Sequence, residues 1–432
     1  MTKGRRFFKL AGMTAQVAGS YATTRIKSMF QSEENAETDL KAAHERNGGR
    51  IAKTLGELKG AVMKVGQMAS IAGDILPKEL AEALRGLQRE APPVDFEVIA
   101  GQIERELGAP PESLFKRFDR KPFASASIGQ VHRATTDDGR EVVVKVQYPG
   151  VDTAVSSDLS QLKLVLKASG LIKIRKQALD EVFKEVKARL AEELDYCNEA
   201  DNVRKFREYH ARHPFVVIPE VVGERSAQRV LTLTYEPGDH VSDLDKLGYD
   251  QPTRDLLGQH LFKLLIDQLF EFRNLHADPN PGNLAFRRDG SVVLYDFGCV
   301  KQIPDAIIEA YGKTIRCGIE EDYVGVEEGL RGLGVLNPDG PPVEHAYYKI
   351  FRDIFALPFL ANEVFDYGRS TIHDEVLKQV PGAIKRMESF QPPSELVFID
   401  RAIAGHYGNL RKIGARGRFL AMLWPYLYPE SA

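Results

Sequence analysis

The chain has 432 residues, of which 43% are hydrophobic and 28% are charged, with a net charge of −3 at pH 7. Such a composition is typical of a globular protein of about two to three domains. It lacks the basic excess of nucleic-acid-binding proteins, so we expect no nucleic-acid partner. Three cysteines without a Cys-x-x-Cys spacing indicate a reducing compartment, and we expect a cytoplasmic protein. Since no apolar run reaches about 20 residues, the sequence predicts no transmembrane helix.

Residues 1–50 are expected to form a basic segment followed by a polar connector. The first 30 residues contain six basic side chains and no acidic one, with apolar residues between them. Such a segment can lie on an anionic membrane surface, which would give peripheral contact with the inner membrane surface. It can equally be a helix packed on its own domain or a frayed terminus, and the sequence leaves these readings open.

Residues 51–110 have a helical pattern that contains the motif Lys64-Val65-Gly66-Gln67. On a helix, Lys64 and Gln67 stand three positions apart, so both polar heads project from one face. From the residues alone, this is an amphipathic helix with two polar residues at the edge of its apolar face.

Residues 111–238 contain the strands of a predicted smaller lobe. The β-branched run from Glu141 to Val146 carries Lys145 near its end and resembles the kinase strand whose lysine binds ATP phosphates. The glycine-rich loop that precedes this strand in ordinary kinases is missing. Small residues stand in its place, and their backbone N–H groups can still cradle phosphate. The predicted phosphate loop consists of Ala124, Ser125, Ala126, Ser127, Ile128 and Gly129.

A helix predicted over about 179–209 is expected to supply the carboxylate that orients Lys145. Spacing alone does not choose between Glu192, Glu193 and Glu199. Downstream, a predicted strand over 230–235 ends at Glu236-Pro237-Gly238. This break suits the hinge whose backbone binds adenine, so Glu236 is a candidate ATP contact.

The catalytic chemistry is expected in residues 239–432, which otherwise read as mainly helical. Asp278 is followed five residues later by Asn283, and a predicted strand then delivers Asp296 into an Asp-Phe-Gly turn. This is the layout of a kinase phosphoryl-transfer site. Asp278 can accept the hydroxyl proton or orient water, while Asn283 and Asp296 can supply hard oxygen ligands to Mg²⁺. The sequence therefore predicts ATP and Mg²⁺ as ligands.

Three departures from ordinary protein kinases indicate that peptide substrates are not used. Ala277 replaces the arginine before the catalytic aspartate, which normally pairs with a phosphorylated activation loop. Asn280 stands where many Ser/Thr kinases place a lysine on the γ-phosphate. No Ala-Pro-Glu follows Gly298, which leaves less room for a peptide-docking segment.

Together these residues resemble the UbiB/AarF group of atypical protein-kinase-like proteins over about residues 50–420. The resemblance implies an α+β, two-lobed protein-kinase-like fold with an N-terminal helical extension packed on the active-site face. It implies that Glu193 pairs with Lys145, and that Glu199 joins Lys64 and Gln67 in a gating network. The resemblance rests on four motifs: Lys64 to Gln67, the loop ending at Ser127 to His132, Glu193 to Tyr196 with Asn198 to Ala200, and the catalytic residues between His276 and Gly298.

The resemblance also implies an atypical kinase or ATPase in isoprenoid quinone (ubiquinone) biosynthesis or lipid metabolism. Its partners would be a quinone precursor or lipid and the proteins of quinone biosynthesis. Two alternatives stay open. One is a small-molecule phosphotransferase of the aminoglycoside or choline kinase type, and the other is a nucleotide-gated binding protein without turnover.

Overall fold

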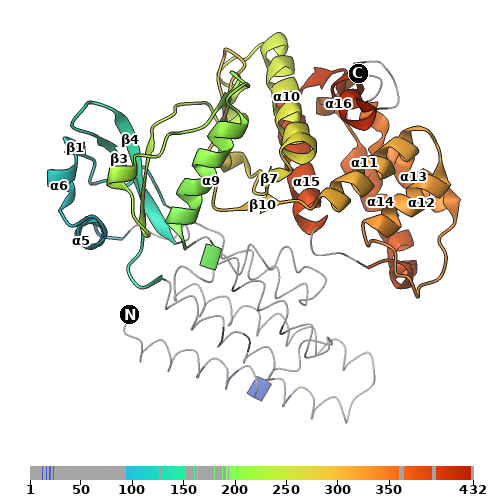
Figure 1. Ribbon diagram of the computed structural model, residues 1–432, viewed down its shortest axis with the longest axis horizontal. Coiled ribbons are helices and arrows are strands. Elements are labelled where there is room, and N and C mark those ends of the chain that lie inside the picture. Colours follow the sequence, from blue (N-terminus) through green and yellow to red (C-terminus); the bar gives the residue numbers. More distant parts are fainter. Residues whose placement is uncertain are drawn as a thin grey trace. The chain divides into compact units, whose positions relative to one another are not determined.

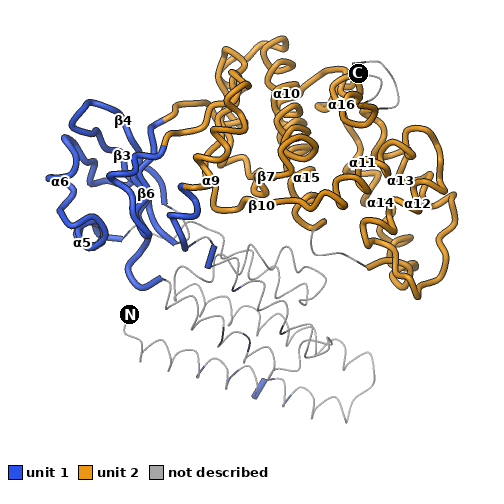
Figure 2. The backbone as a smooth tube through the Cα atoms, in the orientation of Figure 1, with its two compact units in different colours: residues 1–200, 221–235 blue, residues 201–220, 236–432 orange. Residues whose placement is uncertain are grey.

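The computed structural model describes residues 94–125, 128–151, 194–359, 364–391 and 396–429, with a few single residues elsewhere. The chain divides into two compact units (Figure 2), unit 1 with Met1–Ala200 and Val221–Tyr235, and unit 2 with Asp201–Glu220 and Glu236–Ala432. The division after Tyr235 lies close to the predicted boundary at 238. Residues 201–220, which we predicted in the smaller lobe, instead belong to unit 2, because they lead into a strand that pairs with the catalytic hairpin.

Unit 1 is built on an antiparallel sheet with the strand order β1-β3-β4-β6, to which β2 adds by pairing with β3. A tight turn joins β3 to β4, with Gly139 in the left-handed region at φ 88°. In this register Lys145 of β4 lies between Val131 of β3 and Leu231 of β6. The strands are β1 (Arg117–Phe118), β2 (Ala124–Ser125), β3 (Gly129–Thr135), β4 (Glu141–Gln147) and β6 (Val230–Thr234).

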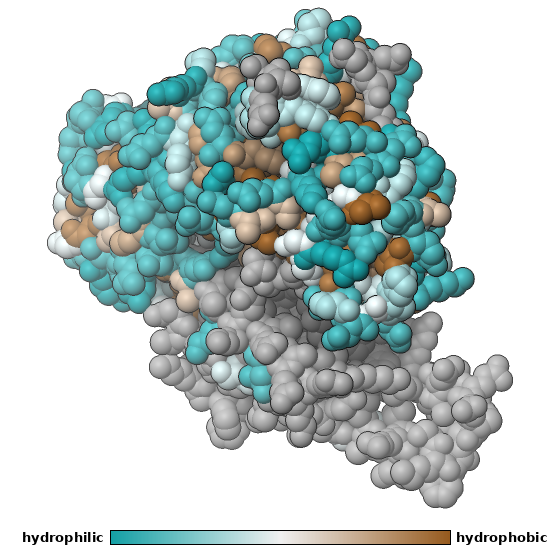
Figure 3. Space-filling view, turned by 45° about the vertical axis from the view of Figure 1, so that its right-hand side comes forward, coloured by the Kyte–Doolittle hydropathy of each residue, from teal (hydrophilic) through white to brown (hydrophobic). Residues whose placement is uncertain are grey.

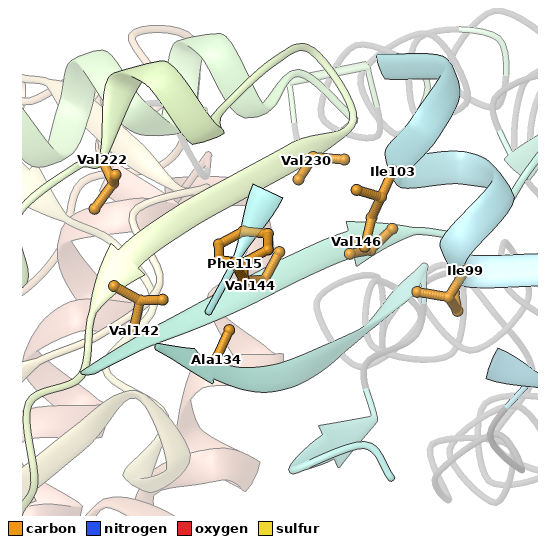
Figure 4. Packing of buried hydrophobic residues seen from close by; sticks show 9 residues of the cluster. All are labelled: Ile99, Ile103, Phe115, Ala134, Val142, Val144, Val146, Val222 and Val230. Atoms are coloured by element: carbon orange, nitrogen blue, oxygen red, sulfur yellow. The ribbon is translucent and has the colours of Figure 1, made fainter. Parts of the chain in front are cut away.

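The core of unit 1 lies between this sheet and helix α5 (Phe96–Leu107), followed by the short α6 (Pro111–Leu114). Ile99 and Ile103 of α5 point onto valines of β4 and β6 (Figure 4), and both are fully buried. The end of the predicted helical extension over 51–110 is thus part of the unit 1 core. Lys64 and Gln67 lie outside the described residues, as does the predicted packing of the extension on the active-site face.

Helix α9 (Tyr196–Tyr209) differs from the continuous helix predicted over 179–209. The chain leaves helical conformation at Leu194 and Asp195, and α9 begins after them. The Asp195 Oδ1 accepts hydrogen bonds from the backbone N–H groups of Cys197 (3.0 Å) and Asn198 (3.3 Å). An aspartate that binds the N–H groups after it starts a new helix, which is why the prediction of one helix was wrong.

Unit 2 contains a hairpin between Asn283 and Asp296, here called the catalytic hairpin, which is formed by β8 (Leu284–Phe286) and β9 (Val292–Leu294). Strand β5 (Val216–Val217) pairs with β9 in parallel. Strand β7 (Asn274–His276) pairs with β10 (Val300–Gln302). It is followed by the catalytic loop, residues 277–283, which contains Asp278 and ends at Asn283. A short 3-10 turn, η5 (Pro281–Asn283), leads directly into β8, so Asn283 stands at the start of the hairpin.

The rest of unit 2 is mainly helical (Figure 1), as predicted, with α15 packed beside α10. Buried side chains of α15, such as Ile399 and Ala402, share a core with Leu275 of β7. The helices are α10 (Gln251–Ile266), α11 (Asp305–Ile319), α12 (Tyr323–Gly332), α13 (His345–Phe355), α14 (Ile372–Lys385), α15 (Leu396–Ile413) and α16 (Phe419–Leu427). Strand β11 (Phe365–Asp366) pairs with β12 (Arg416–Gly417).

Short single turns complete the described part of the chain: the 3-10 turns η2 (Gly223–Arg225), η3 (Val241–Asp243), η6 (Leu357–Phe359), η7 (Tyr367–Arg369) and η8 (Met387–Ser389), and the π-helical η4 (Asp267–Glu271). Among the described residues, no helix is both long enough and apolar enough to cross a membrane. On the face drawn in Figure 3, their hydrophobic side chains lie as separate patches within a mainly hydrophilic surface.

Candidate active site

Lys145 projects from β4 of unit 1 and forms a buried ion pair. Its Nζ lies 2.9 Å from both carboxylate oxygens of Glu199, which is in the first turn of α9. The Lys145 side chain is 15% exposed and that of Glu199 only 2%. The ammonium also lies 5.1 Å from the centre of the Tyr196 ring. Since a buried charge is tolerated only when it is paired, these contacts hold Lys145 in one orientation.

Glu199 is one of the three carboxylates that the spacing left open, while the pairing of Lys145 with Glu193 that the family resemblance implies stays a prediction. The new helix start at Tyr196 explains how Glu199 reaches Lys145. Tyr196 and Glu199 are three positions apart on α9, so both reach the same lysine from one helix face. Glu193 lies outside the described residues, and so do the other members of the network predicted for Glu199.

The predicted phosphate loop is described in part. Ala124 and Ser125 form β2, Ile128 is buried, and residues 126 and 127 lie outside the described ranges. Gly129 has a packing role, because a Cβ atom there would lie 2.2 Å from the carbonyl oxygen of Val146. Only glycine lets β3 approach β4 so closely at this point. Contact between this loop and phosphate stays a prediction.

Two buried polar residues of β3, Gln130 and His132, belong to the motif that carries the family resemblance but had no predicted role of their own. The Gln130 side chain accepts from the Val94 backbone N–H (3.1 Å) and lies 3.0 Å from His132 Nε2. The His132 Nδ1 lies 2.8 Å from the Asp119 carbonyl oxygen. Burial lowers the pKa of His132, so the ring is neutral, donating from Nδ1 and accepting at Nε2. These bonds fix the strand that follows the predicted phosphate loop.

In unit 2, the catalytic hairpin brings the two predicted metal ligands together. The Tyr295 backbone N–H donates to the Asn283 carbonyl oxygen at 2.9 Å, so Asp296 directly follows a residue paired with Asn283. Asp296 has a φ of 51°, which is unusual for a residue other than glycine. His276 Nε2 donates to the Asp296 carbonyl oxygen (2.8 Å), and the Gly298 N–H donates to its Oδ1 (3.2 Å). Backbone strain of this kind is retained mainly at functional sites.

Asp278 and Asn283 are joined by the amide of Asn283. Its Nδ2 donates to the carbonyl oxygen of Asp278 at 3.1 Å and to the carboxylate Oδ2 at 3.0 Å. Because both bonds use the amide nitrogen, the amide oxygen of Asn283 remains available as a metal ligand. This oxygen and the Asp296 carboxylate are hard ligands that fit Mg²⁺.

No group of three or more His, Cys, Asp or Glu residues within the described ranges could hold a metal ion. Mg²⁺ at kinase sites takes only one or two protein ligands and completes its coordination with phosphate and water. The donor set of Asn283 and Asp296 therefore suits a metal that arrives with its nucleotide.

Helix α15 supports the catalytic loop, a feature that our sequence analysis missed. Arg401 Nη2 donates to Asp278 Oδ1, and Asn409 Nδ2 donates to the Pro279 carbonyl oxygen at 3.0 Å. Between them, a Cβ atom on Gly405 would lie 2.3 Å from Pro279 Cγ. These three residues recur every four positions, so one face of α15 contacts the loop. That spacing of one charged, one small and one polar residue is the signal that could have revealed the contact.

The predicted hinge residue Glu236 is fixed by bonds within unit 2. Its carbonyl oxygen accepts from the Tyr295 hydroxyl at 2.6 Å, and its carboxylate accepts from Arg287 Nη2 at 2.8 Å. Tyr295 directly precedes Asp296, so one hydroxyl connects the predicted hinge to the catalytic hairpin. Adenine binding at Glu236 stays a prediction.

Comparison with known proteins places these residues in a family. The model of the ABC1 atypical kinase-like domain matches residues 86–330. The chain belongs to this family. This confirms the resemblance to the UbiB/AarF group and, with it, the kinase-like α+β fold.

Relatives of this ABC1-family chain are found in several organisms. It is 33% identical to the chloroplast protein ACTIVITY OF BC1 COMPLEX KINASE 7 of Arabidopsis thaliana, covering 93% of this chain and 58% of that protein. It is 30% identical to the mitochondrial atypical kinase COQ8B of Danio rerio, covering 89% and 62%. The chain thus spans about three-fifths of the length of these relatives. A solved structure of Rv3197 with erythromycin from Mycobacterium tuberculosis is 29% identical with a TM-score of 0.65, covering 91% of this chain and 97% of that one.

Proposed function

We propose that this chain binds Mg-ATP and acts as an atypical kinase or ATPase. The observation that carries the proposal is the arrangement of Asp278, Asn283 and Asp296 around the ends of one hairpin. Asn283 uses its amide nitrogen on Asp278, and its oxygen stays available beside a strained Asp296. A purely structural loop has no need for this combination of an oriented amide oxygen and two carboxylates.

Each residue has a defined role in the proposed reaction. Lys145 contacts the α- and β-phosphates, and the predicted phosphate loop covers them. Asn283 and Asp296 hold Mg²⁺, which neutralises phosphate charge when bound. Asp278 accepts the proton of the attacking hydroxyl or water. The new bond joins that oxygen to the γ-phosphorus, and the bond to the bridging oxygen breaks to release ADP.

The acceptor is proposed to be a small molecule, a lipid or water rather than a protein. The absence of the activation-loop arginine at Ala277 and of an Ala-Pro-Glu motif supports this choice. The relatives that are named COQ8 atypical kinases support a role in isoprenoid quinone metabolism. With that role, the partners of the chain would be a quinone precursor or lipid and quinone-biosynthesis proteins, and the chain would make peripheral contact with a membrane.

ATP turnover by the purified full chain tests the proposal. Phosphate release and phosphorylated product are measured with Mg²⁺, with and without anionic liposomes, and with a phenolic quinone-precursor mimic. The inactive variant is Asp296→Asn, and the matched control is Asp374→Asn, an exposed carboxylate of α14. We expect turnover that rises with liposomes or phenol, is lost in Asp296→Asn and is unchanged in Asp374→Asn.

The same experiment separates the alternatives. A phosphorylated alcohol formed in equal amount to ADP would indicate a small-molecule phosphotransferase of the aminoglycoside or choline kinase type. Nucleotide binding without turnover under every condition would overturn the enzyme assignment and leave a nucleotide-gated binding protein.

A further inference from the structure

The catalytic loop of this chain lacks the positive charge that many kinases place next to the γ-phosphate. The lysine two residues after the catalytic aspartate is replaced by Asn280, whose side chain instead accepts from the Gly282 N–H at 3.1 Å. Phosphoryl transfer spreads negative charge over the γ-phosphoryl oxygens, and a positioned cation there stabilises the transition state. A cation from elsewhere in the chain would have to take that position.

Arg401 brings such a cation to the catalytic aspartate. Its Nη2 bonds Asp278 Oδ1, while Asn283 bonds the other carboxylate oxygen, Oδ2. A guanidinium has five N–H donors, and the Arg401 side chain is still 36% exposed. Asp278 is its one hydrogen-bond partner among the described residues. Arg401 therefore keeps donors to offer a ligand while one edge is held in place.

The position of Arg401 is set by the helix that carries it. The close approach at Gly405 and the bond from Asn409 fix α15 against Pro279, the residue after Asp278. A side chain on the same helix face as these two contacts stands in a defined place beside the loop. A transition-state contact requires such pre-organisation, because the free energy of ordering the side chain is then lost during folding and not during the reaction.

We propose that Arg401 is the cation of the phosphoryl-transfer step, replacing from α15 the lysine that the catalytic loop lacks. In the resting protein it pairs with Asp278. In the reaction its remaining N–H groups bind the γ-phosphoryl oxygens as the acceptor oxygen attacks and ADP leaves, and Asp278 receives the acceptor proton. Arg401 gains no proton and forms no covalent bond. This inference rests on the proposed function.

Binding of a transition-state mimic tests the inference without relying on turnover. Affinities for ADP alone and for ADP with aluminium fluoride are measured by calorimetry with Mg²⁺, for the wild type and Arg401→Ala. The matched control is Arg411→Ala, on the same helix and against the Tyr407 ring. We expect Arg401→Ala to bind ADP normally but to lose most of the extra affinity for ADP with aluminium fluoride. Its kcat should fall about 10²–10³-fold with little change in KM for ATP.

A structural role for Arg401 would not reproduce two further results. Guanidinium at millimolar concentration should restore part of the Arg401→Ala activity, and Arg401→Lys should keep more activity than Arg401→Gln. Circular dichroism and thermal unfolding check that the variants fold, and Arg401→Gln replaces the alanine variant if that one does not.

Three outcomes would overturn the inference. Higher turnover in Arg401→Ala would mean that the arginine is an inhibitory latch on Asp278. Lower turnover with undiminished preference for ADP with aluminium fluoride would mean that it only positions Asp278. An active wild type with unaffected Arg401 variants would remove its role alone, whereas a wild type that neither binds nor hydrolyses ATP would remove the proposed function as well.

Discussion

The ion pair between Lys145 and Glu199 gives a sharp test of which carboxylate orients the ATP lysine. We consider Glu199→Gln, which keeps the shape of the side chain and removes its charge. Removing one partner of a buried pair costs about 3–5 kcal/mol because the other charge is left uncompensated. Here both Nζ–O distances are 2.9 Å and Glu199 is 2% exposed. Lys145 retains some solvent contact and the glutamine oxygen can still accept one bond, so we expect a loss of about 2 kcal/mol in unfolding free energy.

The assay is urea unfolding at pH 7, followed by circular dichroism. A loss of about 2 kcal/mol corresponds to roughly a 30-fold change in the folding equilibrium. Glu208→Gln is the matched control, since Glu208 is an exposed residue of the same helix and should change stability by less than about 0.5 kcal/mol. A Glu199→Gln protein as stable as this control would refute the reasoning. A larger loss in Glu193→Gln would favour the partner implied by the resemblance.

Three further predictions concern the supports of the site. Gly405→Ala should destabilise the protein by about 1–3 kcal/mol and lower ATP turnover, because its Cβ would collide with Pro279. The control Gly408→Ala, with no atom within 4 Å of its Cβ, should stabilise α15 by about 1 kcal/mol. Equal effects of the two substitutions in urea unfolding would contradict this prediction. Burial lowers the pKa of His406 to about 3, whereas in the unfolded chain its pKa is near 6.5. The contribution of neutral His406 to the unfolding free energy is therefore fully present above pH 6.5 and decreases as the pH falls, by about 2 kcal/mol at pH 5. We therefore expect the decrease in unfolding free energy between pH 7 and pH 5, measured by urea unfolding, to be smaller by this amount in His406→Gln than in the wild type. The same decrease in both proteins would contradict this prediction. Gly129→Ala should cost about 1–3 kcal/mol because its Cβ would meet a β4 carbonyl oxygen, and a wild-type unfolding midpoint would rule out that packing role.

The features that the sequence predicted well are those specified by local pattern. The β-branched run around Lys145 forms β4, and the apolar run before Asp296 forms β9. In both cases a short strand and its turn decide where the functional residue stands. The predicted helical character of the region after Glu236 is also confirmed, because its apolar residues recur with helical spacing.

The features that the sequence did not predict depend on contacts between distant segments or on one capping residue. Arg401 is 123 residues from Asp278 in the sequence, and the local pattern around neither residue predicts their pairing. The contact of Glu199 with Lys145 follows from a helix start at Tyr196, which a single aspartate at position 195 creates inside a strongly helical pattern. Local propensity favoured one long helix there, and a hydrogen bond from a side chain decided otherwise.

Equilibrium binding of ATP to the full chain, measured by calorimetry with and without Mg²⁺, tests the central claim most directly. The wild type should bind ATP more tightly with Mg²⁺ than without it. Asp296→Asn should lose that metal dependence, and Lys145→Met should weaken binding in both conditions. Binding that is absent, or that is indifferent to Mg²⁺ and to both substitutions, would contradict the assignment of these residues to a Mg-ATP site.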